Sequence, residues 1–97
     1  MAHYVILANF TEQGIRAVKD SVKRADAFKE MATRAGVKIH ALYWTLGDHD
    51  VVTIAEADDD EAATALSLSV SALGNVRTRT LRAFDAEAFG RILSKIG

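Results

Sequence analysis

The sequence contains neither cysteine nor proline in its 97 residues. The lack of cysteine excludes disulfides, thiolate metal sites and cysteine nucleophiles. The lack of proline argues against linkers and proline-rich recognition segments. No apolar run approaches the roughly 18–20 residues that cross a bilayer, and the start Met1-Ala2-His3-Tyr4 lacks the charged region of a signal peptide. We therefore expect a cytoplasmic protein that makes no contact with a membrane.

An excess of one charge is also missing, because 12 basic residues stand against 13 acidic ones and the formal net charge is −1. Nucleic-acid binders usually carry a basic excess, since contact with phosphates releases counterions. An RNA-recognition module would also need aromatic residues that stack on bases. Ile6 stands at such a position in the apolar run 5–10, and the segment 51–57 contains no aromatic residue. We therefore expect no nucleic-acid partner.

What the sequence does contain is an alternation of extended and helical patterns. β-branched and apolar runs predict strands at residues 3–9, 37–46, 51–57 and 76–84. Apolar residues spaced three and four apart predict helices that begin near Thr11, Ser21, Asp58 and Asp85. This order is the ferredoxin-like βαββαβ plan, with a four-stranded antiparallel sheet and an added C-terminal helix. We predict a single α+β domain over residues 1–97.

The strand patterns also bear on assembly. Alternate residues of a strand face opposite sides of a sheet, and both sides of the strands at 3–9 and 37–46 carry apolar residues. Helices can cover only one face, so we expect the other face to expose Trp44, Leu42, Ile6 and Ile54 to water. Each large apolar side chain left in water loses the stabilisation of about 1.5–3 kcal/mol that its burial would contribute. We infer that a second subunit covers this face; the alternative is that the last helix folds over it.

Six segments of the chain stand out together: Phe10-Thr11-Glu12-Gln13-Gly14-Ile15, Lys19-Asp20-Ser21 with Arg24-Ala25, Phe28-Lys29, Tyr43-Trp44-Thr45-Leu46-Gly47, Asp50-Val51-Val52, and Gly74-Asn75-Val76-Arg77-Thr78. Jointly they resemble the GYD-domain proteins, small bacterial proteins similar in fold to dimeric α+β barrels. The resemblance runs from Tyr4 to about Phe89. It implies a ferredoxin-like fold and self-association as a homodimer or larger oligomer, but it assigns neither a cofactor nor a reaction.

The chain departs from that family at one turn. The family turn usually reads glycine, any residue, tyrosine and aspartate, whereas here it reads Gly47-Asp48-His49-Asp50. A chemical role of the tyrosine hydroxyl would therefore pass to His49 or be lost. Near two carboxylates, an imidazole is favoured in its charged form and could act as an acid or base. The alternative is an ordinary turn with a solvated His49.

Two further sets of residues could bind ligands. His3, His40 and His49 could hold zinc or copper together, but they lie far apart in the sequence and we predict no metal site. Arg77 and Arg79 face the same way in the fourth strand, and could bind a carboxylate or phosphate in bidentate fashion. Because this strand is expected at a sheet edge, the alternative is that these charges discourage unwanted strand pairing.

These patterns favour an oligomeric module that binds a small, partly apolar ligand between sheet and helices or between subunits. The candidate binding residues are Trp44, Asp48, His49, Asp50, Arg77 and Arg79. One alternative is a small enzyme, such as a cofactor-free oxygenase or isomerase, with His49 as the base and an arginine of the fourth strand holding an anion. This alternative rests on fold analogy, which is a poor guide to function. The other alternative is a purely structural assembly module.

Overall fold

The computed structural model describes all residues 1–97, and its elements follow the predicted order. Four strands form one antiparallel sheet: β1 (Ala2–Phe10), β2 (Lys38–Trp44), β3 (Val51–Ala57) and β4 (Val76–Ala83). Their order across the sheet is β2-β3-β1-β4, so β4 lies at an edge as predicted. The prediction of a ferredoxin-like α+β fold is confirmed.

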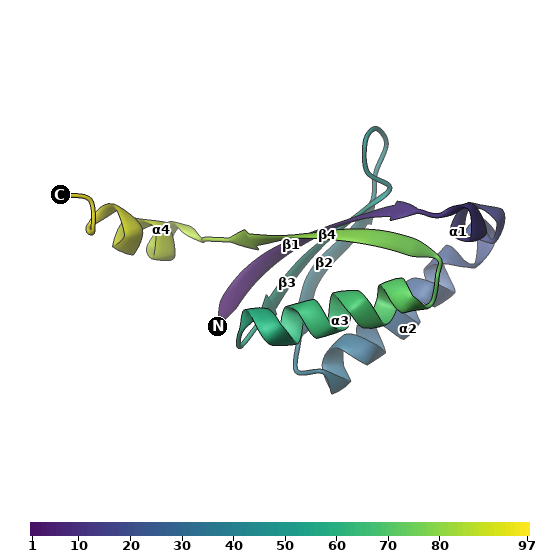
Figure 1. The fold of residues 1–97 in the computed structure, drawn as a ribbon, viewed down its shortest axis with the longest axis horizontal. Coiled ribbons are helices and arrows are strands. Elements are labelled where there is room, and N and C mark those ends of the chain that lie inside the picture. Colours follow the sequence, from purple (N-terminus) through teal and green to yellow (C-terminus); the bar gives the residue numbers. More distant parts are fainter.

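Two long helices, α2 (Ser21–Arg34) and α3 (Asp60–Ala72), lie on the same face of the sheet (Figure 1). A short helix α1 (Glu12–Arg16) and a 3-10 turn η1 (Val18–Asp20) connect β1 to α2. α4 (Ala86–Leu93) follows β4. Three of the four helix starts have a side-chain cap, because Thr11, Asp59 and Asp85 each accept a backbone N–H of the first turn. The N-cap residue of α2, Asp20, forms no such hydrogen bond.

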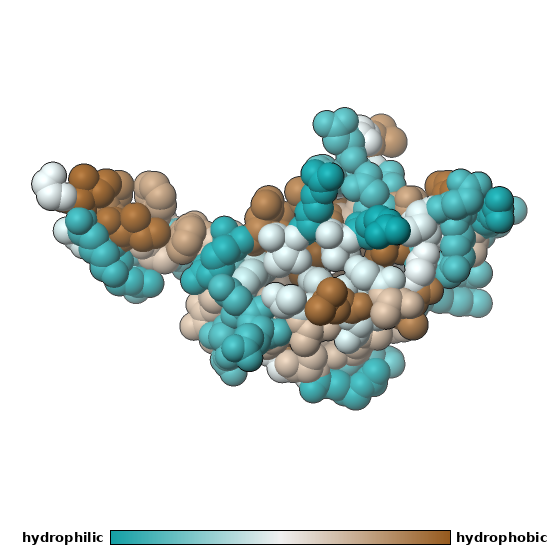
Figure 2. Space-filling view, viewed as in Figure 1, coloured by the Kyte–Doolittle hydropathy of each residue, from teal (hydrophilic) through white to brown (hydrophobic).

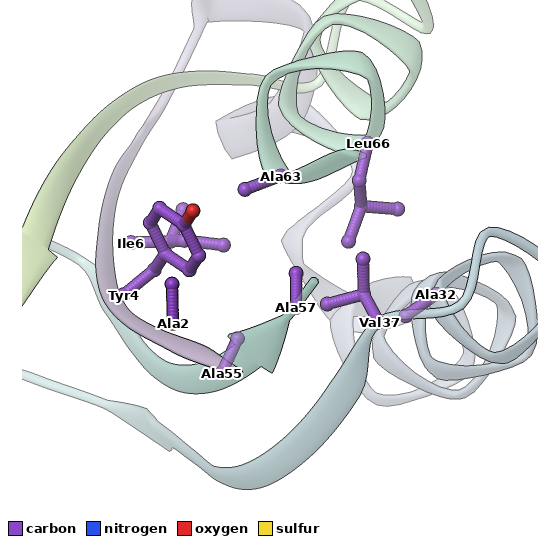
Figure 3. Close-up of a cluster of buried hydrophobic side chains, with 9 residues drawn as sticks. All are labelled: Ala2, Tyr4, Ile6, Ala32, Val37, Ala55, Ala57, Ala63 and Leu66. Atoms are coloured by element: carbon purple, nitrogen blue, oxygen red, sulfur yellow. The ribbon is translucent and has the colours of Figure 1, made fainter. Parts of the chain in front are cut away.

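The buried core occupies one end of the space between sheet and helices (Figure 3). Tyr4, Ile6, Val37 and Leu66 are its large members. The other five members are all alanines: Ala2, Ala32, Ala55, Ala57 and Ala63. Because alanine side chains are short, the C-terminal end of α2 and the N-terminal end of α3 can pack close to the sheet here. The opposite ends of the two helices face larger residues, which is where the pocket described below lies.

The face of the sheet opposite the helices is open, and three of the four residues predicted to lie on it lie on the helix side instead. Ile6 is only 3% exposed beneath the helices, and Leu42 and Trp44 line a pocket with α2 and α3. The strand pairing places another set on the open face: Val5, Leu7, Tyr43, Val52, Ile54 and Leu81. Since both faces are apolar, the sequence held no signal for which one the helices cover; only Ile54 was placed correctly.

A β-bulge in β2 explains part of this error. The register shifts between Ile39, which pairs with Ala55, and Ala41, which pairs with Ile54. The extra residue reverses the alternation of side chains along the strand. Ile39 therefore faces the helices, whereas Ala41 and Tyr43 face the open side, although their spacing in the sequence places all three together.

The C-terminal segment does not cover the open face, so the alternative of a last helix folded over it is wrong. α4 projects from the end of β4 away from the other elements (Figure 1), and the chain measures 51 Å along its longest axis but 18 Å along its shortest. The hydrogen bonds formed by residues 86–97 stay within the C-terminal segment. Apolar side chains crowd this arm (Figure 2), and Phe89, Leu93 and Ile96 are each at least half exposed. None of the helices has both the length and the apolar character that crossing a bilayer requires.

Candidate functional site

A pocket lies between the sheet and the helices, at the end of the layer away from the alanine-rich core. Its floor comes from β1 and β3 through Ile6, Ala8 and Thr53, and its walls come from α2 and α3. The pocket volume is about 130 Å³. Thirteen of its 19 lining residues are hydrophobic, as is typical of sites for small organic molecules.

Trp44 is the predicted binding residue that the structure places in this pocket. It lies at the end of β2 opposite Val51 and is 45% exposed, so its indole forms part of the entrance. Phe28, Met31 and Leu42 are partly buried lining residues nearby. Phe28 and Met31 are the largest apolar side chains of α2, and both line the pocket.

Arg24 is the one charged residue that lines the pocket. Its Nη1 donates to the carbonyl oxygen of Ala17 at 2.8 Å. Its Nη2 lies 3.4 Å from the carbonyl oxygen of Gly14 and 3.3 Å from the Ser21 Oγ. These bonds tie the turn around α1 and η1 to the start of α2. No carboxylate lies within 4.0 Å of its guanidinium.

The predicted turn residues lie at the same end of the sheet but hold β1 rather than lining the pocket. Asp50 Oδ2 accepts the backbone N–H of Phe10 at 2.9 Å, and the Asp48 carbonyl accepts the side-chain amide of Asn9 at 2.7 Å. The His49 Nδ1 donates to Asn9 Oδ1 at 3.1 Å. His49 thus bonds to an amide and forms no ion pair with either aspartate. The role of His49 as a base stays a prediction.

Two of the three histidines meet at the other end of the sheet. His40 Nε2 donates to Glu56 Oε1 at 2.7 Å, and His3 Nε2 lies 3.5 Å from the same oxygen. The two imidazole rings are stacked with centroids 6.5 Å apart. The hydrogen bond from His40 is the main cause that lowers the pKa of Glu56. His49 lies near Asn9, six residues further along β1 than His3, and the chain has no cluster of three or more potential metal ligands.

Arg77 and Arg79 share one face of β4 as predicted, and Arg82 lies on the other face. Arg77 and Arg79 pair with Asn9 and Leu7 and so lie on the open face, away from the pocket. Arg82 lies on the helix side, with its guanidinium 5.6 Å from the centre of the Tyr4 ring. Tyr4 donates a hydrogen bond of 2.5 Å to Asp60. Burial first, and then this hydrogen bond, raise the pKa of Tyr4 to about 12.

The structure therefore separates the predicted binding residues into three places: Trp44 at the pocket, the turn 48–50 at the end of β1, and Arg77 with Arg79 on the open face. Arg24 was not predicted as a binding residue because it lies beside the apolar face of α2, where an arginine side chain is usually exposed to solvent. The available signal was its spacing of four residues from Phe28, which puts both side chains on one side of the helix. Glu56 was missed because it is distant in sequence from both histidines that it contacts.

Comparison with known proteins adds three findings. A family model described as the GYD domain matches residues 4–93. The "Glutamine synthetase and cystathionine beta-lyase binding protein" of Thermus thermophilus is 30% identical over 84 residues, which cover 86% of this chain and 88% of that protein. The crystal structure of the protein TTHA0845 from Thermus thermophilus matches with a TM-score of 0.58 over 89% of this chain and 96% of that one. Its sequence identity is 23%, so this likeness shows the fold alone.

Proposed function

The chain belongs to the GYD domain family, and we propose that it is a protein-binding assembly module whose open sheet face docks on a second copy of the same chain. The observation that carries this proposal is the uncovered apolar face made by residues such as Val5, Leu7, Ile54 and Leu81. The name of the Thermus thermophilus relative, which describes a protein that binds two enzymes, supports a role in protein interaction.

The accessible surface of the chain is larger than its mass requires. A compact monomer of 10.5 kDa exposes about 5,400 Å², whereas this chain exposes 6549 Å². The excess of about 1,100 Å² exceeds the roughly 800 Å² that each partner buries in a standard interface. Only 13 of the 97 residues are buried. One interface of ordinary size would therefore bring the chain to the surface area of a compact protein.

Two apolar surfaces on the same chain support a second copy as the partner. The open face is one, and the projecting arm with Phe89, Leu93 and Ile96 is the other. The loop between β2 and β3 also rises from the sheet on the side away from the helices (Figure 1), and Leu46 in that loop is fully exposed. In a two-fold symmetric dimer, both copies contribute the same surfaces to a single interface. One interface can therefore cover all of these surfaces on both copies.

Sedimentation velocity with a matched pair of variants tests the assembly. Leu81 lies on the open face and is 50% exposed, whereas Leu68 lies on α3 and is 67% exposed. We expect the wild-type chain to sediment as a dimer or larger oligomer, Leu81→Lys to sediment as a monomer, and Leu68→Lys to behave like the wild type. A wild-type chain that sediments as a monomer at high micromolar concentration would contradict the proposal.

The pocket favours a second function, the binding of a small, partly apolar ligand beneath the helices. It is supported by the mostly apolar lining, the pocket volume of about 130 Å³ and the half-exposed Trp44 at the entrance. A ligand that binds only the folded chain raises its melting temperature. A thermal-shift screen of small organic molecules tests this function, and the absence of any stabilising compound would count against it.

A further inference from the structure

The only charged side chain that lines the pocket is a positive one, Arg24. Arg24 lines it, and no aspartate, glutamate, histidine or lysine does. The Arg24 hydrogen bonds go to two backbone carbonyls and one hydroxyl, none of which carries a negative charge. Arg24 is partly buried beside apolar side chains, and its guanidinium has no carboxylate within 4.0 Å.

The guanidinium also keeps free donors. An arginine side chain carries about five N–H donors in a planar fork, and the three hydrogen bonds within the chain use three of them. About two donors remain, one on Nε and one on Nη1, and each can donate a charge-assisted hydrogen bond to an anion. The bonds to Ala17 and Gly14 at the same time hold the side chain in place, so that little conformational entropy is lost when an anion binds.

We propose that this pocket binds a small monocarboxylate with an apolar body, whose carboxylate contacts Arg24 and whose hydrocarbon or aromatic part lies among Phe28, Leu42 and Trp44. The inference rests on the second function proposed above and names its ligand class. A cationic ligand would face the uncompensated charge of Arg24, and a neutral one would leave that charge unpaired in an apolar site. A phosphate ester carries more charge than this single arginine can balance.

The size of the pocket limits the apolar body. A cavity of about 150 Å³ lined by Leu, Ile and Phe side chains accommodates one benzene molecule, and this pocket of about 130 Å³ is of similar size. The body of the ligand is therefore one ring or a short chain, with its carboxylate toward the start of α2. A long fatty acid does not fit within this volume.

The test compares phenylacetate with 2-phenylethanol, two probes that share the aromatic body but differ in charge. Trp44 is the only tryptophan of the chain, so its fluorescence reports on the pocket entrance. We expect saturable binding of phenylacetate, at least about tenfold tighter than that of 2-phenylethanol, which is the ratio that corresponds to one charge-assisted hydrogen-bonded contact. Equal binding of the two probes would overturn the assignment of an anion but keep the pocket as a ligand site. No binding of either probe would overturn both.

Three variants separate the role of Arg24 from a loss of folding. Arg24→Gln is expected to remove the preference for phenylacetate, whereas Arg34→Gln, at the exposed end of the same helix, is expected to keep it. Because Arg24 also ties α1 to α2, Ala25→Leu provides a variant that leaves the arginine in place and fills the pocket. It should abolish the binding of both probes. Full phenylacetate binding by Arg24→Gln or by Ala25→Leu, with the far-ultraviolet circular dichroism unchanged, would refute the proposed site.

Discussion

The most direct test of the packing is the substitution Gly14→Ala. Gly14 is a buried residue of α1, and its backbone lies against that of Asn75, in the segment between α3 and β4. A Cβ atom at Gly14 would lie 1.9 Å from the Asn75 carbonyl oxygen and 2.8 Å from its carbonyl carbon. Both atoms belong to the backbone, so no rotation of a side chain can relieve the overlap.

The structure gives the size of the effect. The Cβ and the oxygen must separate by at least 1.1 Å to reach 3.0 Å, the shortest distance that real contacts show. This movement disturbs the hydrogen bond of 3.1 Å in which the Thr11 N–H donates to the same oxygen. Forcing extra volume into a packed site costs about 1–3 kcal/mol, and losing the hydrogen bond costs about 1 kcal/mol. For a chain of this size, about 3 kcal/mol lowers the melting temperature by about 12–24 °C.

Differential scanning calorimetry measures this effect, and Gly90→Ala is the matched control. Apart from its chain neighbours and the backbone of α4, no atom lies within 4 Å of a Cβ placed at Gly90, so that variant gains only the helix preference of alanine, about 1 kcal/mol, within α4. We expect Gly90→Ala to melt no lower than the wild type. A Gly14→Ala protein that melts within about 2 °C of the wild type would refute the close approach of α1 to Asn75.

Three further predictions follow from the fold. The pKa of Tyr4 is raised from 10.0 to about 12, so the stability that its neutral form contributes is complete below pH 10 and is lost as the pH rises through 12. Tyr4→Phe should flatten this alkaline decline in stability. Urea unfolding at several pH values measures the effect. Leu66→Ala should cost about 2–5 kcal/mol in urea unfolding because Leu66 is 1% exposed, whereas Leu68→Ala should cost less than about 0.5 kcal/mol. In the Leu81→Lys background, which is expected to be monomeric, Asp85→Ala removes the cap of α4. It should lower the helical signal at 222 nm and leave the main melting transition in place. A drop in that transition would show that α4 packs on the rest of its own chain.

Much of the fold could be predicted from the sequence because its signals are local. The periodicity of apolar residues gave every strand and helix, and Thr11, Asp59 and Asp85 act at helix starts through bonds to residues only three positions away. Gly74 adopts a φ of 89° just after α3, a left-handed conformation that glycine readily takes at the end of a helix. These features depend on neighbours in the chain and not on the tertiary arrangement.

The candidate site was harder to predict because its residues come together only through packing. The turn Asp48-His49-Asp50 was singled out for its composition, yet its polar groups bond to Asn9 and Phe10, some 40 positions away in the sequence. Arg24 reaches the pocket, whereas its neighbour Lys23 is exposed and does not line it. Apart from the spacing of four residues between Arg24 and Phe28, no local pattern distinguishes these two basic residues.

The sequence by itself determined the order of the elements, the helix caps and the fact that both sides of the sheet are apolar, because each of these depends on spacing along the chain. Only the tertiary structure decided which side the helices cover, that α4 extends away from the sheet, and that the helices close over alanines at one end and leave a pocket at the other. A strand presents its two faces by the same alternation whichever way it packs. The choice between them is made by the sizes of side chains that meet from distant segments, and this information is absent from any single stretch of sequence.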